Sequence, residues 1–127
     1  MRVLVVDDET DIRDSLQELF QDEGYAVTTA ANGSEALDSL RGEQLPCIVI
    51  LDLLMPGLSG NDVYESMQRD PRLAKVPVIV STSDPSRAPS GVLIMKKPVN
   101  LVRLLGAVRQ HCQPAHALQP AIRRSAG

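Results

Sequence analysis

Short apolar runs alternate along the chain with segments in which apolar residues recur at helical spacing. The runs are rich in β-branched residues and predict strands at residues 2–6, 25–29, 47–51, 78–80 and 92–95. The spaced segments predict a helix after each of the first three strands and a last helix from residue 101 onward. Alternation of this kind is typical of an α/β fold built around a parallel sheet.

Residues that favour helix starts stand just before or at the beginning of the predicted helices. Thr10 or Asp11 is placed to cap the first helix, Asn61 or Asp62 the third, and Asn100 the last. These caps support the helical interpretation of the segments that follow them.

The connection between the last two predicted strands is short for a parallel sheet. It runs over residues 81–91 and contains Pro85 and Pro89. Parallel strands usually need a crossover of about a dozen or more residues that contains a helix. We therefore expect at most about one turn of helix in this connection.

The composition is that of one small domain. Its 127 residues, 43% of them hydrophobic, suit a single core. A net charge of -3 with 16 acidic residues leaves no basic face for nucleic acid, and the few aromatic residues argue against base stacking. No apolar run approaches the ~20 residues of a membrane span, so we expect a cytoplasmic protein, standing alone or cut from a larger chain.

The two cysteines and the C-terminal segment carry no recognisable chemistry. Cys47 and Cys112 have neither metal-ligand spacing nor a CxxC motif, and both are predicted to be reduced thiols in the core or near the surface. The last residues lack a hydrophobic period. We expect a domain over residues 1–113 and a disordered tail or linker over 114–127.

Polar groups follow or end four of the predicted strands. They are Asp7 and Asp8 after the first, Asp52 after the third, Thr82 after the fourth and Lys97 after the fifth. Ligands of open α/β sheets bind outside the carboxyl ends of the strands, where these side chains would converge. Several carboxylates in one place favour a hard divalent cation, and Mg²⁺ fits better than zinc because no His or Cys lies near these strand ends.

The same residues could transfer a phosphoryl group. A carboxylate beside Mg²⁺ can act as a nucleophile toward phosphorus, while Lys97 and the Thr82 hydroxyl could contact the transferred oxygens. The chain contains neither a P-loop nor GxGxxG, so nucleotide binding has no support. Taken singly, these residues also have ordinary interpretations: Asp7 and Asp8 as loop or cap residues, Thr82 as a strand end and Lys97 as a solvated lysine.

Four motifs together carry a family resemblance. VVDDE at 5–9, LDLLMPG at 51–57, VIVST at 78–82 and KKP at 96–98 resemble the receiver domain of two-component response regulators. The resemblance covers residues 1 to about 112. It implies a flavodoxin-like, doubly wound, five-stranded parallel sheet with strand order 2-1-3-4-5, here with the fourth helix reduced or absent.

The resemblance also implies the metal site. Asp52 matches the phosphoaccepting aspartate, and Asp7 and Asp8 match the acidic pair that binds Mg²⁺, Asp8 directly and Asp7 through water. The backbone carbonyl of Leu54 matches the remaining protein ligand.

Thr82 and Lys97 match the other two family positions. Thr82 corresponds to the switch hydroxyl and Lys97 to the lysine that contacts the phosphoryl group. In the family the bond that corresponds to Lys97–Pro98 is commonly cis.

Two departures concern how the signal leaves the domain. The short segment 83–91 cannot supply a full fourth helix, and Ile94 stands where receivers usually carry an aromatic residue. The familiar coupling between the threonine and that aromatic residue cannot operate in its usual form.

The resemblance implies a signalling module and not an enzyme. A histidine kinase or histidine phosphotransfer protein would donate a phosphoryl group to Asp52, and an unknown downstream protein would read the change, without direct contact to nucleic acid or membrane. One alternative is an interaction module that works independently of phosphorylation. Another is a Mg²⁺-dependent phosphohydrolase, although Glu9 stands where the common DxD pattern would place its second aspartate.

Overall fold

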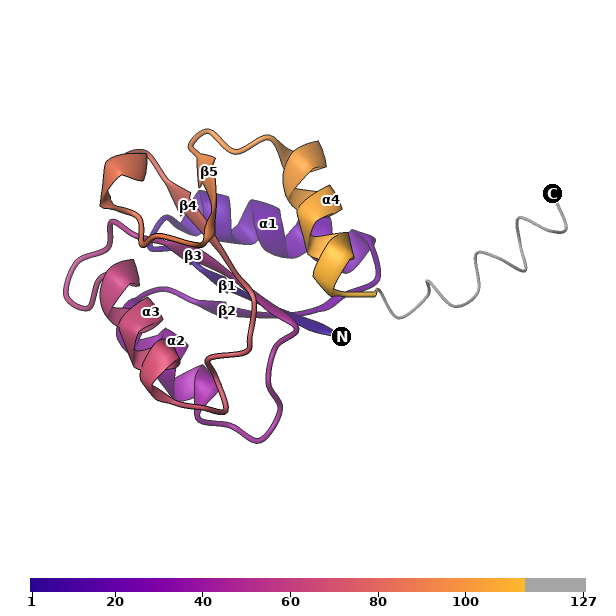
Figure 1. The fold of residues 1–127 in the computed structure, drawn as a ribbon. Coiled ribbons are helices and arrows are strands. Elements are labelled where there is room, and N and C mark those ends of the chain that lie inside the picture. Colours follow the sequence, from indigo (N-terminus) through magenta and orange to yellow (C-terminus); the bar gives the residue numbers. More distant parts are fainter. Residues whose placement is uncertain (114–127) are drawn as a thin grey trace, which may run out of the picture.

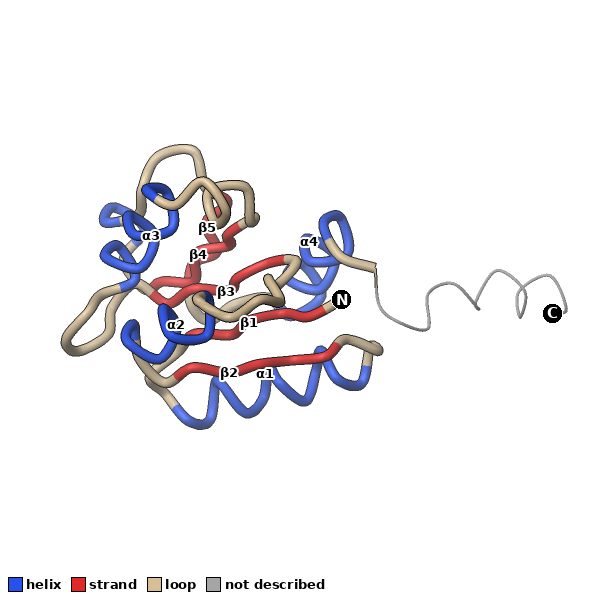
Figure 2. Tube along the Cα trace, turned by 90° about the horizontal axis from the view of Figure 1, so that it is seen from below, coloured by secondary structure: helices blue, strands red, loops and turns tan. Residues whose placement is uncertain are grey.

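The computed structural model describes residues 1–113 and contains one parallel sheet of five strands in the order β2-β1-β3-β4-β5. The strands lie side by side in this order in Figure 2. Their bounds are β1 Arg2–Val6, β2 Ala26–Ala30, β3 Ile48–Asp52, β4 Val78–Thr82 and β5 Leu93–Lys96. The predicted fold class and strand order are confirmed, while the predicted tail at 114–127 lies outside the described residues.

Helices cover both faces of the sheet (Figure 1). Residues of α1 and α4 share one buried apolar cluster with the strands, and residues of α2 and α3 share the other. The helix bounds are α1 Thr10–Asp22, α2 Gly33–Leu40, α3 Gly60–Arg69 and α4 Leu101–His111.

The central strands explain why the sheet needs helices on both sides. In β1, Val3 and Val5 belong to the cluster under α1 and α4, while Leu4 and Val6 belong to the cluster under α2 and α3. All five residues of β3 are buried. A strand that is apolar on both faces is stable only inside such a layered arrangement.

All the predicted strands except 2–6 differ from the structure by one or two residues at their ends, and two of these differences have identifiable reasons. Tyr25 was predicted to open the second strand, but its N–H donates to the Phe20 carbonyl and closes the end of α1. At the other edge, β4 extends beyond residue 80 because Ser81 pairs with Asp52 and Thr82 with Lys96.

Two of the predicted helix caps are wrong and one is confirmed. The N-cap of α1 is Glu9, whose side chain makes no cap bond, and the Glu9 N–H donates to the Asp7 carboxylate at 2.9 Å. The N-cap of α3 is Ser59, which forms a reciprocal capping box with Asp62. Asn100 caps α4 as predicted, since its side chain accepts from the Arg103 N–H.

The short connection between β4 and β5 contains a single 3-10 turn, Pro85–Arg87, as the sequence predicts. Asp84 caps this turn through the Ser86 N–H. The Asn61 side chain of α3 donates to the Arg87 carbonyl at 3.0 Å and ties the connection to its neighbour.

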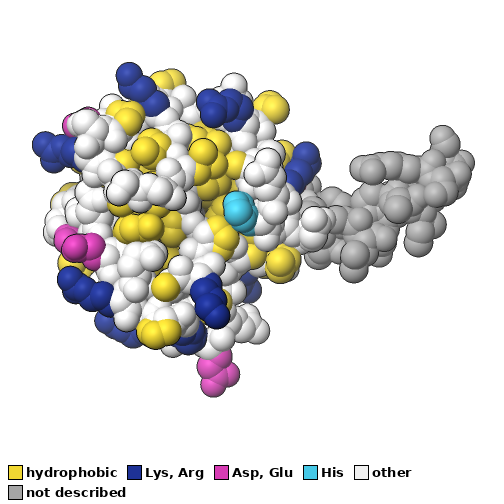
Figure 3. Space-filling model, in the orientation of Figure 1, with side chains coloured by type: hydrophobic (Ala, Val, Ile, Leu, Met, Phe, Trp, Pro, Cys, Tyr) yellow, Lys and Arg dark blue, Asp and Glu magenta, His cyan; other side chains and the backbone are white. Residues whose placement is uncertain are grey.

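The face that a longer connection would cover is partly apolar. Figure 3 shows hydrophobic side chains gathered in the middle of this face. Leu93 of β5 is 45% exposed, and Ile94 is half-buried. The short connection thus leaves apolar side chains of β5 partly exposed.

The cysteines contradict the sequence prediction of two reduced thiols. Cys47 and Cys112 form a disulfide that joins the residue before β3 to the residue after α4, 65 positions apart. Spacing along the chain could not reveal this pair, because only the packing of α4 on the sheet brings the two residues together. Within residues 1–113, no helix is long and apolar enough to cross a membrane.

Candidate functional site

Three carboxylates meet at the carboxyl edge of the sheet. Asp7 follows β1, Asp8 comes next in the chain, and Asp52 is the last residue of β3. Oxygen atoms of the three lie within 4.8 Å of one another. Asp7 and Asp52 are only 2% and 3% exposed, whereas Asp8 is open to solvent. The carboxylate convergence predicted from the sequence is therefore present.

Lys97 provides the positive charge of this cluster. Its Nζ lies 3.0 Å from Asp7 Oδ2, 3.5 Å from Asp52 Oδ1 and 3.8 Å from Glu9 Oε1. Burial works to lower the pKa of Lys97, but the bond to Asp7 and the charges of Asp52, Asp7 and Glu9 outweigh it and raise that pKa. The ammonium group is therefore held in its charged form.

The positive charge of Lys97 does not fully offset the effects that raise the pKa of Asp52. Burial and then the charge of Asp7 raise the pKa of Asp52 to about 6, against the lowering effects of Lys97 and of the Leu54 N–H. A buried carboxylate with a raised pKa beside two further acids is short of positive charge. The oxygen-rich donor set fits a hard divalent cation such as Mg²⁺.

Backbone contacts fix the position of Asp7. Its Oδ1 accepts from the Glu9 N–H, and its carbonyl oxygen accepts from Arg13 Nη1 at 2.7 Å. Sequence reasoning missed Arg13. Its position in α1 is a weak sequence signal for a site residue, because a single arginine on a helix surface forms no pattern.

Thr82 and Leu54 occupy the rim of the same edge. Thr82 is fully buried, and its hydroxyl accepts from the Asp84 N–H at 3.1 Å and donates to the Asp84 carbonyl at 3.4 Å. Leu54 is 42% exposed, and its N–H donates to Asp52 Oδ1 at 3.3 Å. The threonine hydroxyl is thus engaged with the short β4–β5 connection.

The segment after β5 brings Lys97 into the site. The Lys97 N–H donates to the Thr82 carbonyl at 2.9 Å, and the Lys97–Pro98 bond is cis, as the family resemblance implied. Lys96 is exposed and outside the cluster.

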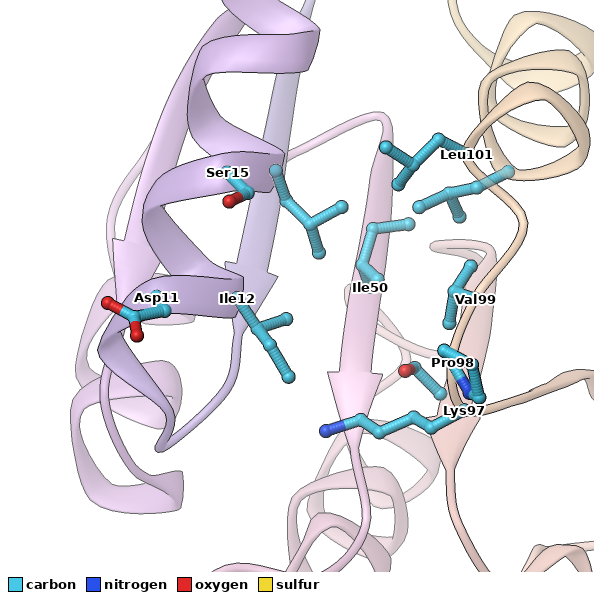
Figure 4. A pocket seen from close by; sticks show the side chains of 11 residues that line it. Asp11, Ile12, Ser15, Ile50, Lys97, Pro98, Val99 and Leu101 are labelled. Atoms are coloured by element: carbon cyan, nitrogen blue, oxygen red, sulfur yellow. The ribbon is translucent and has the colours of Figure 1, made fainter.

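A groove lies beside the acidic cluster, between α1 and the start of α4 (Figure 4). It encloses about 310 Å³, and Lys97 lies at its lower edge in the view. Most of its lining is apolar and comes from Ile12, Leu16, Ile50, Val99, Leu101 and Leu104. The groove therefore places an apolar surface next to the acidic cluster.

Comparison with known protein families identifies the family of this domain. Residues 3–109 match the family model described as the response regulator receiver domain. The chain belongs to this family. Receiver domains are signalling modules of two-component systems and bind Mg²⁺ at an acidic pocket, and the cluster of Asp7, Asp8 and Asp52 in this receiver is consistent with such a pocket.

Relatives of the receiver domain include proteins of similar and of greater length. A 14.6 kDa protein of Leptolyngbya boryana, described as uncharacterized, is 33% identical over 119 residues, which cover 88% of this chain and 90% of that protein. Response regulator Rre1 of Synechocystis is 38% identical over 82 residues, which cover 64% of this chain but 35% of that protein. The receiver spans about a third of the length of several regulators that it matches.

Solved structures agree with the family assignment. A response regulator receiver protein from Pseudomonas putida is 30% identical with a TM-score of 0.79, covering 86% of this chain and 95% of that one. Response regulator TrrA from Thermotoga maritima, solved in complex with Mg(2+)-BeF, is 33% identical with a TM-score of 0.77, covering 87% and 98%.

Proposed function

We propose that the receiver domain takes a phosphoryl group onto Asp52 from a histidine kinase or a histidine phosphotransfer protein and signals by altered binding to a downstream protein. The observation that carries this proposal is the buried Asp52 carboxylate, which lies against an acidic pair and a charged lysine. This combination supplies a nucleophile, a set of metal ligands and a positive contact at one point.

The metal ligands would be the carboxylates of Asp7, Asp8 and Asp52 and the carbonyl oxygen of Leu54. When bound there, Mg²⁺ offsets negative charge on the oxygens of the transferring group. The raised pKa of Asp52 supports this assignment, because a nearby cation would favour the ionised carboxylate that attacks.

In the transfer step, an oxygen of Asp52 forms a bond to phosphorus as the bond between phosphorus and the donor imidazole nitrogen breaks. The imidazole keeps the electron pair of that bond, and an acyl phosphate remains on Asp52. Lys97 is placed to pair with an oxygen of the new phosphoryl group, since its Nζ already lies 3.5 Å from Asp52 Oδ1.

Thr82 would report the modification to the rest of the domain. Its hydroxyl is bound to the backbone of Asp84, and turning toward a phosphoryl group would break these bonds. The β4–β5 connection would then lose a contact that fixes it, which gives the site a route to the surface.

The proposed setting is the one that the sequence predicts. In this proposal the receiver domain comprises residues 1–113 and acts in the cytoplasm without direct binding to nucleic acid or membrane. Its kinase or phosphotransfer donor can approach over the apolar groove beside Lys97.

Incubation with Mg²⁺ and acetyl phosphate tests the assignment. The wild-type chain should gain the mass of one phosphoryl group, and Asp52→Asn should gain none. Asp14→Asn, an exposed aspartate on α1, is the matched control and should react like wild type. Modification of the Asp52→Asn variant at the wild-type rate would refute the assignment.

The short β4–β5 connection favours a second candidate function, an interaction module that does not depend on phosphorylation. The connection has only one 3-10 turn, and Ile94 stands where an aromatic residue usually lies. Equal affinity of a downstream protein for wild type, phosphorylated wild type and Asp52→Asn would favour this second function.

A further inference from the structure

The Cys47–Cys112 disulfide fastens the end of α4 to the sheet, on the opposite edge from the acidic cluster. Cys47 precedes β3, whose far end carries Asp52, and Cys112 follows α4, whose first residue comes four positions after Lys97. The Cα atoms of the two cysteines are 5.7 Å apart, within the ordinary range for a disulfide. The bond therefore joins two elements that both lead to the site.

Two weaker contacts hold the same end of α4. The Tyr25 hydroxyl donates to the Cys112 carbonyl at 2.9 Å, and Arg109 pairs with Glu23. Without the disulfide, α4 would remain in place but would be held by a hydrogen bond, a surface ion pair and apolar packing. A helix end that is held only by these contacts unfolds locally more often than one that is tied by a covalent bond.

The proposed location makes this bond unusual. Cytoplasmic thiols are kept reduced, and the disulfides that do occur there are usually transient, catalytic or redox-sensing. The pair has no metal-ligand spacing and lies away from the acidic cluster, so a catalytic role has no support in the described residues.

We propose that Cys47 and Cys112 form a reversible, redox-sensitive latch that sets how firmly α4 is held against the sheet. The inference rests on the cytoplasmic part of the proposed function but not on phosphorylation of Asp52. In the oxidised domain the disulfide ties the C-terminal end of α4 to the sheet. In the reduced domain this turn is held only by noncovalent contacts and is looser.

The fold accommodates both redox states. Cys47 Sγ lies 3.2 Å from the Arg2 carbonyl oxygen, so a reduced Cys47 thiol has an acceptor in place. Cys112 is 1% exposed within an apolar cluster, where a free cysteine packs as a small hydrophobic residue. Cys47 is only half-buried and is the sulfur that a small reagent reaches first.

The oxidant is a low-molecular-weight disulfide such as oxidised glutathione. The Cys47 thiolate attacks one glutathione sulfur and releases one glutathione thiolate, and the Cys112 thiolate then displaces the second from Cys47. Two protein thiols lose two protons and two electrons, and one glutathione disulfide becomes two glutathione thiols. Reduction runs through the same steps in reverse.

The groove beside the site is partly lined by the start of α4. Val99, Leu101 and Leu104 line this groove and lie before or within the first turn of α4. The helix whose C-terminal turn the disulfide ties down therefore also supplies part of the surface next to Lys97, at its other end.

The test uses the wild-type chain without Mg²⁺ in buffers of graded reduced and oxidised glutathione. Alkylation followed by mass measurement gives the fraction of disulfide, and hydrogen exchange follows residues 101–112. We expect reduction to raise exchange at the end of α4 by at least about tenfold and to lower Tm by on the order of 10 °C.

The Cys47→Ser, Cys112→Ala double variant supplies the control. It should exchange like reduced wild type in every buffer. Failure of the disulfide to form in oxidised glutathione, or equal exchange of α4 in both states, would overturn the latch. Because Asp52 plays no part in these measurements, a receiver that cannot be phosphorylated could still show the latch, and the two proposals fail separately.

Discussion

Lys97 stabilises carboxylates that belong to different parts of the chain. Its ammonium group contacts Asp7 and Glu9 at the start of the domain and Asp52 at the end of β3. Burial of Asp52 and the charge of Asp7 outweigh this one positive charge, so the pKa of Asp52 stays raised at about 6. Ionised Asp52 therefore lowers the stability of the folded protein when no cation is bound.

The raised pKa of Asp52 predicts a pH-dependent stability of metal-free protein. Between its ordinary pKa of 3.8 and about 6, the folded state binds a proton that the unfolded state has released. The free energy of unfolding therefore falls as the pH rises through this window, and the penalty is complete above about pH 6. Asp52→Asn should remove the penalty and raise the free energy of unfolding near neutral pH by on the order of 1–2 kcal/mol. The gain is smaller than the full shift implies, because the variant also loses the attraction to Lys97.

Urea denaturation in EDTA across a pH series measures this effect. The gain from Asp52→Asn should shrink toward zero below about pH 4, while Asp14→Asn should show no such window. A gain that stayed constant across the series would argue against a raised pKa at Asp52.

At the scale of elements, the start of α3 sets the position of Asp52. Gly60 is the first residue of α3, and its N–H donates to the Leu53 carbonyl at 3.0 Å. A Cβ at this position would lie 2.3 Å from the carbonyl oxygen of Asp52 and 2.6 Å from Leu53 Cα. The helix can approach the end of β3 this closely only because residue 60 has no side chain.

Two glycine substitutions therefore should have opposite effects. Gly60→Ala should lower the free energy of unfolding by about 1–3 kcal/mol or more, because backbone atoms must move to admit the methyl group. Gly106→Ala, within α4 and with nothing within 4 Å of the new Cβ, should raise it by about 0.5–1 kcal/mol. Thermal or urea denaturation of both variants checks the pair. A stable Gly60→Ala variant with wild-type phosphorylation would contradict the proposed role of this close approach.

For the whole molecule, the sequence predicted the layers and the acidic edge, because both depend on local patterns. β1 and β3 are apolar on both faces, and their polar ends at Asp7 and Asp52 must lie together once the strands are parallel. The cap at Ser59 was missed because Asn61 and Asp62, which also favour helix starts, follow it closely. Arg13 and the disulfide were missed because their partners are a backbone carbonyl and a residue 65 positions away, which leave no periodic signal.

The disulfide also closes the chain between Cys47 and Cys112 into a ring. The closed loop from Cys47 to Cys112 includes Asp52, Thr82 and Lys97, and it passes through the exposed Arg87. Limited trypsin digestion that cuts the chain once, after Arg87, should yield two fragments on a reducing gel but one cross-linked molecule on a non-reducing gel. Separation of the fragments without reductant would show that the ring is open in solution.

Because of this ring, the residues of the pocket would stay linked after one peptide bond within it is cleaved. A cut in the β4–β5 connection would assign Asp52 and Lys97 to different polypeptides, yet the sulfur bridge would keep the two pieces at a fixed ratio and in register. After such a cut, the two fragments of the oxidised receiver would stay covalently linked at any dilution. In the reduced receiver the same cut would allow the fragment with Lys97 to dissociate from the fragment with Asp7 and Asp52.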